Sequence, residues 1–291
     1  MQTPCSFRLG HLELMIFSDG YQMLAPAHPM IGPYERPDYI QQALRAQELP
    51  TDALQLDLNI LLIRHSDQLI LIDAGLGQED TTGGLLPASL SAAGIPATAI
   101  TDVVLTHAHT DHTGGLLHPD GSPVFPNARI HLSDAEYNHW MQGPPDFSAS
   151  PLDAATGLKK ALTTRIPEIL SAIRPQLRLA DPQATLCDCI RLIPAPGHTT
   201  GHSMVEIFSG EETLLHSADL LHTAVLLQHP EWGMFYDMDF GQAALTREKV
   251  LQEEAKKTRM TMTYHLPWPG LGRIKQGSAG FEWEPVIPSG K

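Results

Sequence analysis

The chain has 291 residues, of which 42% are hydrophobic, and its 33 acidic residues against 19 Lys and Arg give a formal charge of −14. This length and apolar content suit a folded α/β protein with a large core. The acidic balance, with no Lys/Arg cluster, argues against binding to nucleic acid or an anionic membrane. No signal-peptide pattern and no apolar run of about 18 residues occurs, so we expect a cytoplasmic protein.

The chain has few cysteines and many histidines. Cys5, Cys187 and Cys189 are too few for a disulfide framework and lack CxxC spacing, so we expect reduced thiols. Fifteen histidines are many for such a chain. Because His is the commonest metal ligand and a frequent acid or base, their placement is informative.

The first half of the chain alternates predicted strands and helices. Residues 58–75 form two apolar runs around a polar turn at 65–67, which predicts a β-hairpin. Residues 86–93, closed by Gly94, predict a short helix. Residues 101–106 predict a buried strand that leads into a histidine-rich segment, at the strand end where α/β folds usually place their chemistry.

Two helices are expected next. Ser133 and Glu136 form a capping-box pattern, which predicts a helix with one apolar face made by Tyr137, Trp140 and Met141. Residues 152–173 predict a second helix, broken near Pro167.

The remaining elements complete a second group of strands. Glycine turns separate predicted strands at 189–194, 203–208 and 212–219. Asp239 with Gln242 caps a helix that continues to Lys257, and a strand at 260–264 leads to His265. No repeat or linker is visible, so we expect a single domain over residues 1–291. Its N-terminal part, 1–55, includes a Pro- and Met-rich stretch at 20–34 that could be a lid or a dimer contact.

The segment from Thr106 to Gly115 carries four potential metal ligands within six residues, namely His107, His109, Asp111 and His112. Neutral imidazoles and a carboxylate suit Zn²⁺, Mn²⁺ or Fe²⁺. A polar loop with incidental histidines is the alternative, but this density at the end of an apolar strand favours a metal site.

Three further candidate ligands each follow a strand-like run: His198 in PAPGHTTGHS, Asp219 in LLHSADLLH and His265 in MTYHLPWPG. A carboxylate can bridge two cations, and two cations about 3.5–4 Å apart can share a hydroxide whose pKa they lower. Together with the first segment, these residues predict a site for two metal ions.

The order and spacing of HxHxDH, HTxGH, Asp and His, over roughly residues 55–275, resemble the metallo-β-lactamase-fold hydrolases. The resemblance implies an α/β protein built as a four-layer αβ/βα sandwich. It also implies that Asp73 supports the ligand loop, although Asp73 could instead simply form a turn. The implied ligands are His107, His109 and His198 for the first metal, Asp111, His112 and His265 for the second, and Asp219 as the bridge.

Some branches of this family fit less well. The diiron oxidoreductases replace the second histidine with Glu, so His109 favours hydrolysis. The β-lactamases lack the bridging Asp, which is present here as Asp219, and glyoxalase II enzymes carry a helical tail longer than the 26 residues after His265. Stretches such as LILIDAGLG, VFPNARIHLSDAEYNHW and HSADLLHTAVLLQHP resemble the methyl parathion hydrolase-like subgroup, which is similar to the N-acyl homoserine lactone lactonases.

One departure concerns the substrate. The best-known lactonases place a Tyr three residues after the bridging Asp, whereas this chain has His222. His222 could donate a hydrogen bond to the substrate or be an ordinary histidine. Trp140, Phe235 and Trp268 are candidate walls of a substrate pocket, with core packing as the alternative.

We therefore expect a two-metal hydrolase acting on a neutral, partly apolar ester, lactone or phosphotriester, with an N-acyl homoserine lactone as the alternative substrate. Zinc is the expected metal, with manganese or iron as alternatives. Asp111 and His222 are the candidate catalytic residues, Asp111 orienting the nucleophile as well as binding metal. The expected partner is a small molecule, and a homodimer is compatible with the sequence. A non-catalytic metal-binding protein and an iron redox protein on the same fold are the rival classes.

Overall fold

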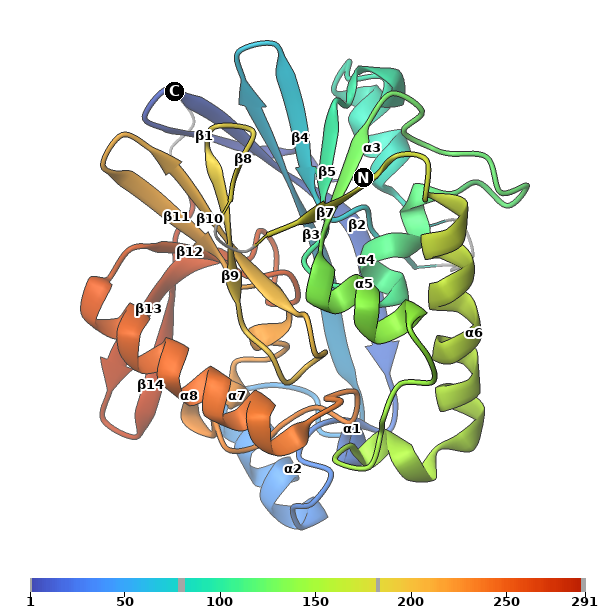
Figure 1. Ribbon diagram of the computed structural model, residues 1–291. Coiled ribbons are helices and arrows are strands. Elements are labelled where there is room, and N and C mark those ends of the chain that lie inside the picture. Colours follow the sequence, from blue (N-terminus) through green and yellow to red (C-terminus); the bar gives the residue numbers. More distant parts are fainter. Residues whose placement is uncertain (1, 78–81, 182–183, 289–291) are drawn as a thin grey trace.

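The computed structural model of the chain describes residues 2–77, 82–181 and 184–288. Two seven-stranded sheets face each other, one with the order β1 to β7 and the other with the order β14 to β8. Helices α3 to α6 cover the outer face of the first sheet, and α8 covers the outer face of the second (Figure 1). The layers are therefore helix, sheet, sheet and helix, which confirms the predicted four-layer sandwich.

The first sheet changes from antiparallel to parallel along its width. Strands β1 to β4 pair antiparallel, whereas β4 to β7 pair parallel. The predicted hairpin is confirmed as β3 and β4. Parallel strands end at the same edge of a sheet, so the segments that follow β4 and β5 meet there. The strands are β1 Cys5–Leu9, β2 Leu12–Leu24, β3 Leu54–His65, β4 Gln68–Ile72, β5 Asp102–Val104, β6 Arg129–Ser133 and β7 Leu177–Ala180.

The second sheet is antiparallel except for the pair β11 and β12. Three predicted strands of this sheet are shorter than expected: β9 begins at Ile190 rather than at residue 189, β12 ends at Met262 rather than at residue 264, and the third is the strand predicted over 212–219. Cys187 and Asp188 have φ of 49° and 58°, so they form a left-handed turn before β9. The strand predicted over 212–219 ends at His216. The strands are β8 Thr185–Leu186, β9 Ile190–Pro194, β10 Ser203–Ser209, β11 Glu212–His216, β12 Met260–Met262, β13 Leu271–Gly277 and β14 Gly280–Pro285.

The predicted helices at 86–93, after Ser133 and after Asp239 are confirmed. The side chains of Ser133 and Asp239 accept the capping bonds from Glu136 N and Gln242 N. The α-helices are α1 Ala27–Met30, α2 Pro37–Ala46, α3 Leu86–Ala92, α4 Thr110–Thr113, α5 Asp134–Met141, α6 Thr156–Ala172, α7 Val225–Gln228 and α8 Phe240–Lys257. The 3₁₀ turns are η1 Ala97–Ala99, η2 Gly114–Leu116, η3 Pro151–Ala154 and η4 Ala218–Leu220.

The predicted break near Pro167 is wrong. Helix α6 continues through Pro167, and the break lies at Ala155, between η3 and α6. Proline removes one backbone donor from a helix. Here the helix keeps its course because its apolar face, which includes Ile166 and Ile169, is buried against the first sheet.

Apolar side chains fill the space between the sheets, where Ile16 and Leu61 of the first sheet join Val205 and Ile207 of the second in one core cluster. The N-terminal stretch 20–34 packs on the same chain. Its Ile31 is fully buried, and Phe235 N donates a hydrogen bond to Met30 O at 2.8 Å. This stretch therefore packs as part of the fold, while its roles as a lid or as a dimer contact stay predictions.

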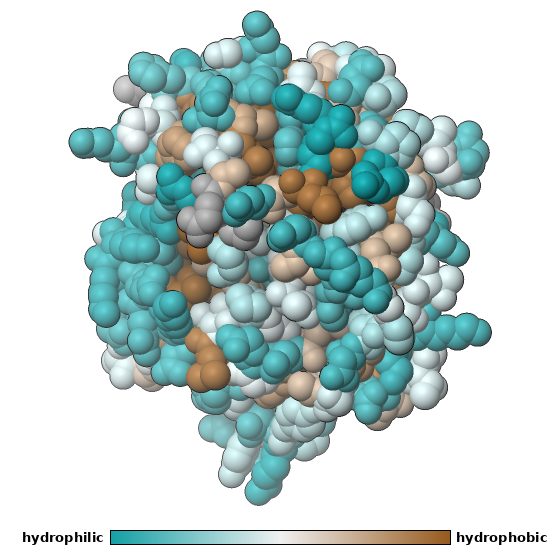
Figure 2. Space-filling view, in the orientation of Figure 1, coloured by the Kyte–Doolittle hydropathy of each residue, from teal (hydrophilic) through white to brown (hydrophobic). Residues whose placement is uncertain are grey.

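The surface in Figure 2 is mainly hydrophilic, with apolar side chains in smaller groups. Within the described residues, no helix has both the length and the hydropathy needed to cross a bilayer. All three cysteines are free, as expected, and Cys189 is buried.

Candidate metal centre

The histidine-rich segment leaves β5 and turns at once into the short helix α4. Two glycines make this turn fit. A Cβ on Gly114 would overlap the backbone of Leu76, and a Cβ on Gly115 would overlap that of Ala74. Because no larger residue fits there, the loop lies directly on the segment that follows β4.

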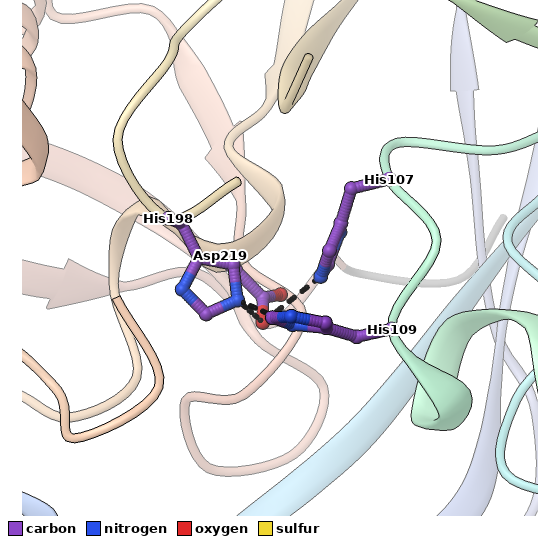
Figure 3. Close-up of side chains that lie close together, drawn as sticks. All are labelled: His107, His109, His198 and Asp219. Atoms are coloured by element: carbon purple, nitrogen blue, oxygen red, sulfur yellow. Dashed lines mark hydrogen bonds and ion pairs between the residues drawn. The ribbon is translucent and has the colours of Figure 1, made fainter. Parts of the chain in front are cut away.

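The other candidate ligands reach the same edge from the second sheet. His198 lies between β9 and β10, Asp219 lies in η4 after β11, and His265 follows β12. The structure brings all seven predicted ligands together in two groups that share Asp219. One group is His107, His109, His198 and Asp219, and the other is Asp111, His112, Asp219 and His265. Figure 3 shows the first group, with the imidazoles of His107 and His109 from one loop and that of His198 from another gathered around the Asp219 carboxylate.

The distances within these groups suit cation binding. Asp219 Oδ2 lies 3.2 Å from His198 Nε2 and 3.3 Å from His265 Nε2, while Asp219 Oδ1 lies 3.0 Å from His112 Nε2. Asp111 Oδ2 lies 3.5 Å from His265 Nε2. Ligands about 2.0–2.1 Å from a tetrahedral zinc ion are roughly 3.3 Å from one another. The donor atoms therefore already have the spacing of a coordination shell.

Several of these donor atoms lack a hydrogen bond. Among the described residues, His107 Nε2 is buried without a hydrogen-bond partner, and so are His112 Nε2 and Asp219 Oδ1, whose 3.0 Å contact does not have hydrogen-bond geometry. Such atoms are costly unless something else binds them. Burial, together with the neighbouring imidazoles, lowers the pKa of His107 and of His109 well below the ordinary value. Both rings are therefore neutral, which is the form that binds a metal ion. The residues fit a pair of divalent cations.

Asp73 lies behind the ligand loop. Its Oδ2 is 2.8 Å from His112 Nδ1, and its two oxygens accept bonds from Thr106 N at 2.8 Å and Thr106 Oγ1 at 2.9 Å. Its φ of 64° also makes it a turn residue, so both readings of Asp73 apply to its position. These contacts orient one imidazole and fix the start of the loop.

Sequence reasoning missed a similar carboxylate, Asp237. Its Oδ1 lies 2.8 Å from His198 Nδ1, and its Oδ2 lies 3.3 Å from the buried guanidinium of Arg247. Burial alone would raise the pKa of Asp237, but the His198 hydrogen bond and the Arg247 charge hold it far below the ordinary value. A single Asp in a loop has no periodic signature, so nothing in the sequence pointed to it.

His202, the last residue of the HTTGH segment, also has a defined position. Asp219 N donates a hydrogen bond to His202 Nε2 at 3.1 Å, and His202 Nδ1 pairs with Ala195 O at 2.8 Å. Burial lowers the pKa of His202 to about 4, so the ring is neutral and can accept this bond. His202 thus holds the backbone of the shared carboxylate.

His222 lies beside the shared carboxylate. Its Nε2 is 3.1 Å from Asp219 Oδ2, and its ring stacks on that of His265 with centroids 4.9 Å apart. Burial lowers the pKa of His222 to about 4, so the ring is neutral at physiological pH.

A cavity of about 210 Å³ opens over the two groups. Six of the clustered side chains form its polar floor: His109, Asp111, His198, Asp219, His222 and His265. The rest of the wall is mainly aliphatic and includes Leu24 and Leu56 from the first sheet and Leu158 and Leu162 from α6, with Gln22, Thr110 and Tyr236 as polar members.

The predicted aromatic wall needs correction, because Trp140, Phe235 and Trp268 are not among the residues that line this cavity. Trp140 is 2% exposed and belongs to the core under the ligand loops. Phe235 packs against the same core, and Trp268 packs against the core between the sheets. These three large apolar side chains therefore take part in core packing, which was the alternative interpretation.

Comparisons with known proteins agree with this geometry. The family model for the metallo-beta-lactamase superfamily matches residues 55–265. The solved structure of AidC, a dizinc quorum-quenching lactonase in complex with a product, is 36% identical, with a TM-score of 0.94 over 99% of this chain and 98% of that one. The hydrolase AbOPH, described as a member of the beta lactamase superfamily, is 23% identical with a TM-score of 0.88 over 100% and 99% of the two chains, and it supports the fold.

A probable metallo-hydrolase of Mycobacterium bovis is 26% identical over 188 residues, which is 56% of this chain and 56% of that protein. The chain thus spans about half the length of the curated relatives that it matches. Taken together, the fold, the two His/Asp groups and the family match support a site for two divalent cations. The chain belongs to the metallo-beta-lactamase superfamily.

Proposed function

We propose that the chain is a metal-dependent hydrolase that cleaves a neutral, partly apolar lactone or ester, with an N-acyl homoserine lactone as the leading substrate and a phosphotriester as a second. The observation that carries the proposal is a cavity directly over the two ligand groups, with a polar floor and a mainly aliphatic wall above it. The similarity to AidC, a dizinc lactonase, ranks the lactone first.

The seven clustered residues are the proposed ligands. His107, His109 and His198 would hold one cation, and Asp111, His112 and His265 the other, with Asp219 facing both. When bound, a pair of divalent cations, which we propose to be zinc, activates water and polarises the scissile carbonyl. The remaining steps depend on how the chain holds the substrate and moves protons.

Two polar side chains at the floor of the cavity have further proposed roles. Asp111 is part of the cavity floor, so its carboxylate can accept a hydrogen bond from the attacking water and orient it. His222 is neutral, and with its proton on Nε2, which faces Asp219 Oδ2 at 3.1 Å, it would donate to a substrate oxygen once bound cations occupy the Asp219 carboxylate. His222 would then replace the tyrosine that other lactonases use.

The wall of the cavity favours an uncharged substrate. Leu24, Leu56, Leu158 and Leu162 offer an apolar surface to an acyl or alkyl group. Neither Lys nor Arg occurs among the described residues that line the cavity. A polyanion would therefore find no counter-charge in the wall and would meet a chain of net charge −14.

A substrate panel tests this proposal. Metal-loaded protein should be assayed with an N-acyl homoserine lactone, simple lactones, aryl esters, phosphotriesters and an anionic phosphodiester. We expect the highest kcat/KM for a neutral lactone, nearly independent of ionic strength, because screening acts mainly on charged ligands. A preference for the phosphodiester that is lost steeply with added salt would refute the proposed substrate class.

A further inference from the structure

A buried carboxylate, Glu136, lies in the first turn of α5 beneath the ligand loops, with 0% of its surface exposed. Its Oε1 accepts hydrogen bonds from Ala108 N at 3.0 Å and from Trp140 Nε1 at 2.8 Å. Its Oε2 accepts bonds from Thr199 Oγ1 at 2.6 Å and from Gly201 N at 2.9 Å. The Glu136 carboxylate therefore bonds to the ligand loops and to Trp140, and not to the amino end of α5 as in a capping box.

The donors come from both loops that carry the first ligand group. Ala108 stands between His107 and His109, whereas Thr199 and Gly201 follow His198. One carboxylate thus joins the loop after β5 in the first sheet to the loop before β10 in the second. Ser203 N also links them through Thr106 O at 3.0 Å, but that bond joins residues that lie before Ala108 and after Gly201 in the chain.

The packing around Glu136 leaves little freedom. A Cβ on Gly201 would overlap the backbone of Glu136, so this loop rests directly on the helix. Ser133 Oγ donates to Gly201 O at 2.9 Å, which fixes the loop at a second point. Trp140, one turn further along α5, donates the fourth hydrogen bond to the carboxylate. Both oxygens are thereby fully used, and the carboxylate orientation is fixed.

We propose that Glu136 is a positioning residue that sets the spacing between the His107 and His109 loop and His198, and thereby the affinity of the first cation site. The proposal rests on the two-cation site of the proposed function. Glu136 itself does not line the cavity and acts through the two loops. Three of the four hydrogen bonds to this side chain come from the loops that hold His109 and His198, whose Nδ1 and Nε2 atoms lie 2.9 Å apart.

The test is Glu136→Gln, because a glutamine offers one acceptor oxygen and would turn its amide protons toward backbone and hydroxyl donors. Metal-free protein should be titrated with Zn²⁺ by calorimetry, in the wild type and in a His265→Ala background that weakens the second site. We expect the first-site Kd to rise by about 10- to 100-fold, as for the loss of other groups that orient ligands. Activity should fall at limiting zinc and recover at saturating zinc.

Asp134→Asn is the matched control, because Asp134 lies in the same helical turn, is exposed and carries the same charge. This variant should bind zinc as the wild type does. If Glu136→Gln does not fold, Thr199→Val removes a single donor and should raise the first-site Kd by a smaller factor, about 3- to 10-fold. An unchanged first-site Kd in a folded variant of either kind would overturn the role of Glu136. A wild type that binds no zinc would instead overturn the proposed function.

Discussion

The two ends of strand β5 each carry a buried cluster of Asp and His, yet the clusters differ in completeness. At the amino end, Asp102 accepts bonds from Arg129 Nε at 2.9 Å, Arg129 Nη2 at 3.0 Å and His131 Nε2 at 2.8 Å. Beyond the carboxyl end, His107 Nε2 and Asp219 Oδ1 are buried without a hydrogen bond. Protein groups supply the hydrogen bonds to the Asp102 carboxylate, whereas buried polar atoms of the metal-ligand cluster have no hydrogen-bond partner in the described part of the protein.

Charge explains this difference. Burial would raise the pKa of Asp102, but the His131 and Arg129 bonds outweigh it and lower that pKa to about 2. Asp102, His131 and Cys187 have a metal-like spacing, but Arg129 already occupies both carboxylate oxygens. At the other end, several imidazoles surround the Asp219 carboxylate, and among the described residues no guanidinium pairs with it. The first cluster therefore stabilises the fold, and the second is suited to cations.

The largest expected effect follows removal of the shared carboxylate. Asp219→Ala should lower kcat by roughly 10³-fold or more, because both ligand groups lose a member and their spacing is no longer fixed. Circular dichroism should show an intact fold. Turnover that matches the wild type would refute the two-group site, whereas Asp102→Asn, at the other end of β5, should retain its activity.

A smaller loss is expected from the carboxylate that orients His112. Asp73→Ala should weaken zinc binding by about 10- to 100-fold, because the imidazole and the start of the ligand loop lose their support. Competition with a chelator of known affinity measures this change. Wild-type affinity in Asp73→Ala would show that Asp73 is only a turn residue.

His222→Ala should lower kcat/KM by about 10-fold with metal content unchanged, because one hydrogen bond to the substrate is lost. Comparison of lactone kinetics with elemental analysis separates this effect from loss of metal. Full activity in the variant would make His222 an ordinary buried histidine.

The smallest effect on catalysis is expected at the satisfied cluster. The folded pKa of Asp102, about 2, lies below its ordinary value of 3.8. Its contribution to the free energy of unfolding, on the order of 2 kcal/mol, is therefore complete above about pH 4 and is lost as the pH falls toward 2. The stability difference between metal-free wild type and Asp102→Asn should shrink over that range in denaturant titrations. A difference that is constant with pH would contradict this assignment.

The sequence predicted the metal ligands better than it predicted the residues that surround them. The metal ligands stood out because four of them are adjacent in the chain and the others follow strands with clear apolar patterns. Glu136 and Asp237 carried no such signal, since their partners are distant in sequence. The cavity wall was mispredicted for the same reason: Leu24 and Leu158 come from β2 and α6, far from the ligand segments, and only the packed fold brings them together.

The metal content of the purified chain tests the difference between the two clusters most directly. Elemental analysis of protein prepared without chelator should give two divalent cations per chain, and the number should fall in His107→Ala and in His265→Ala. It should not change in Cys187→Ser, because the Asp102 cluster is complete without a cation. One cation in the wild type, or a third that is lost with Cys187, would contradict this interpretation.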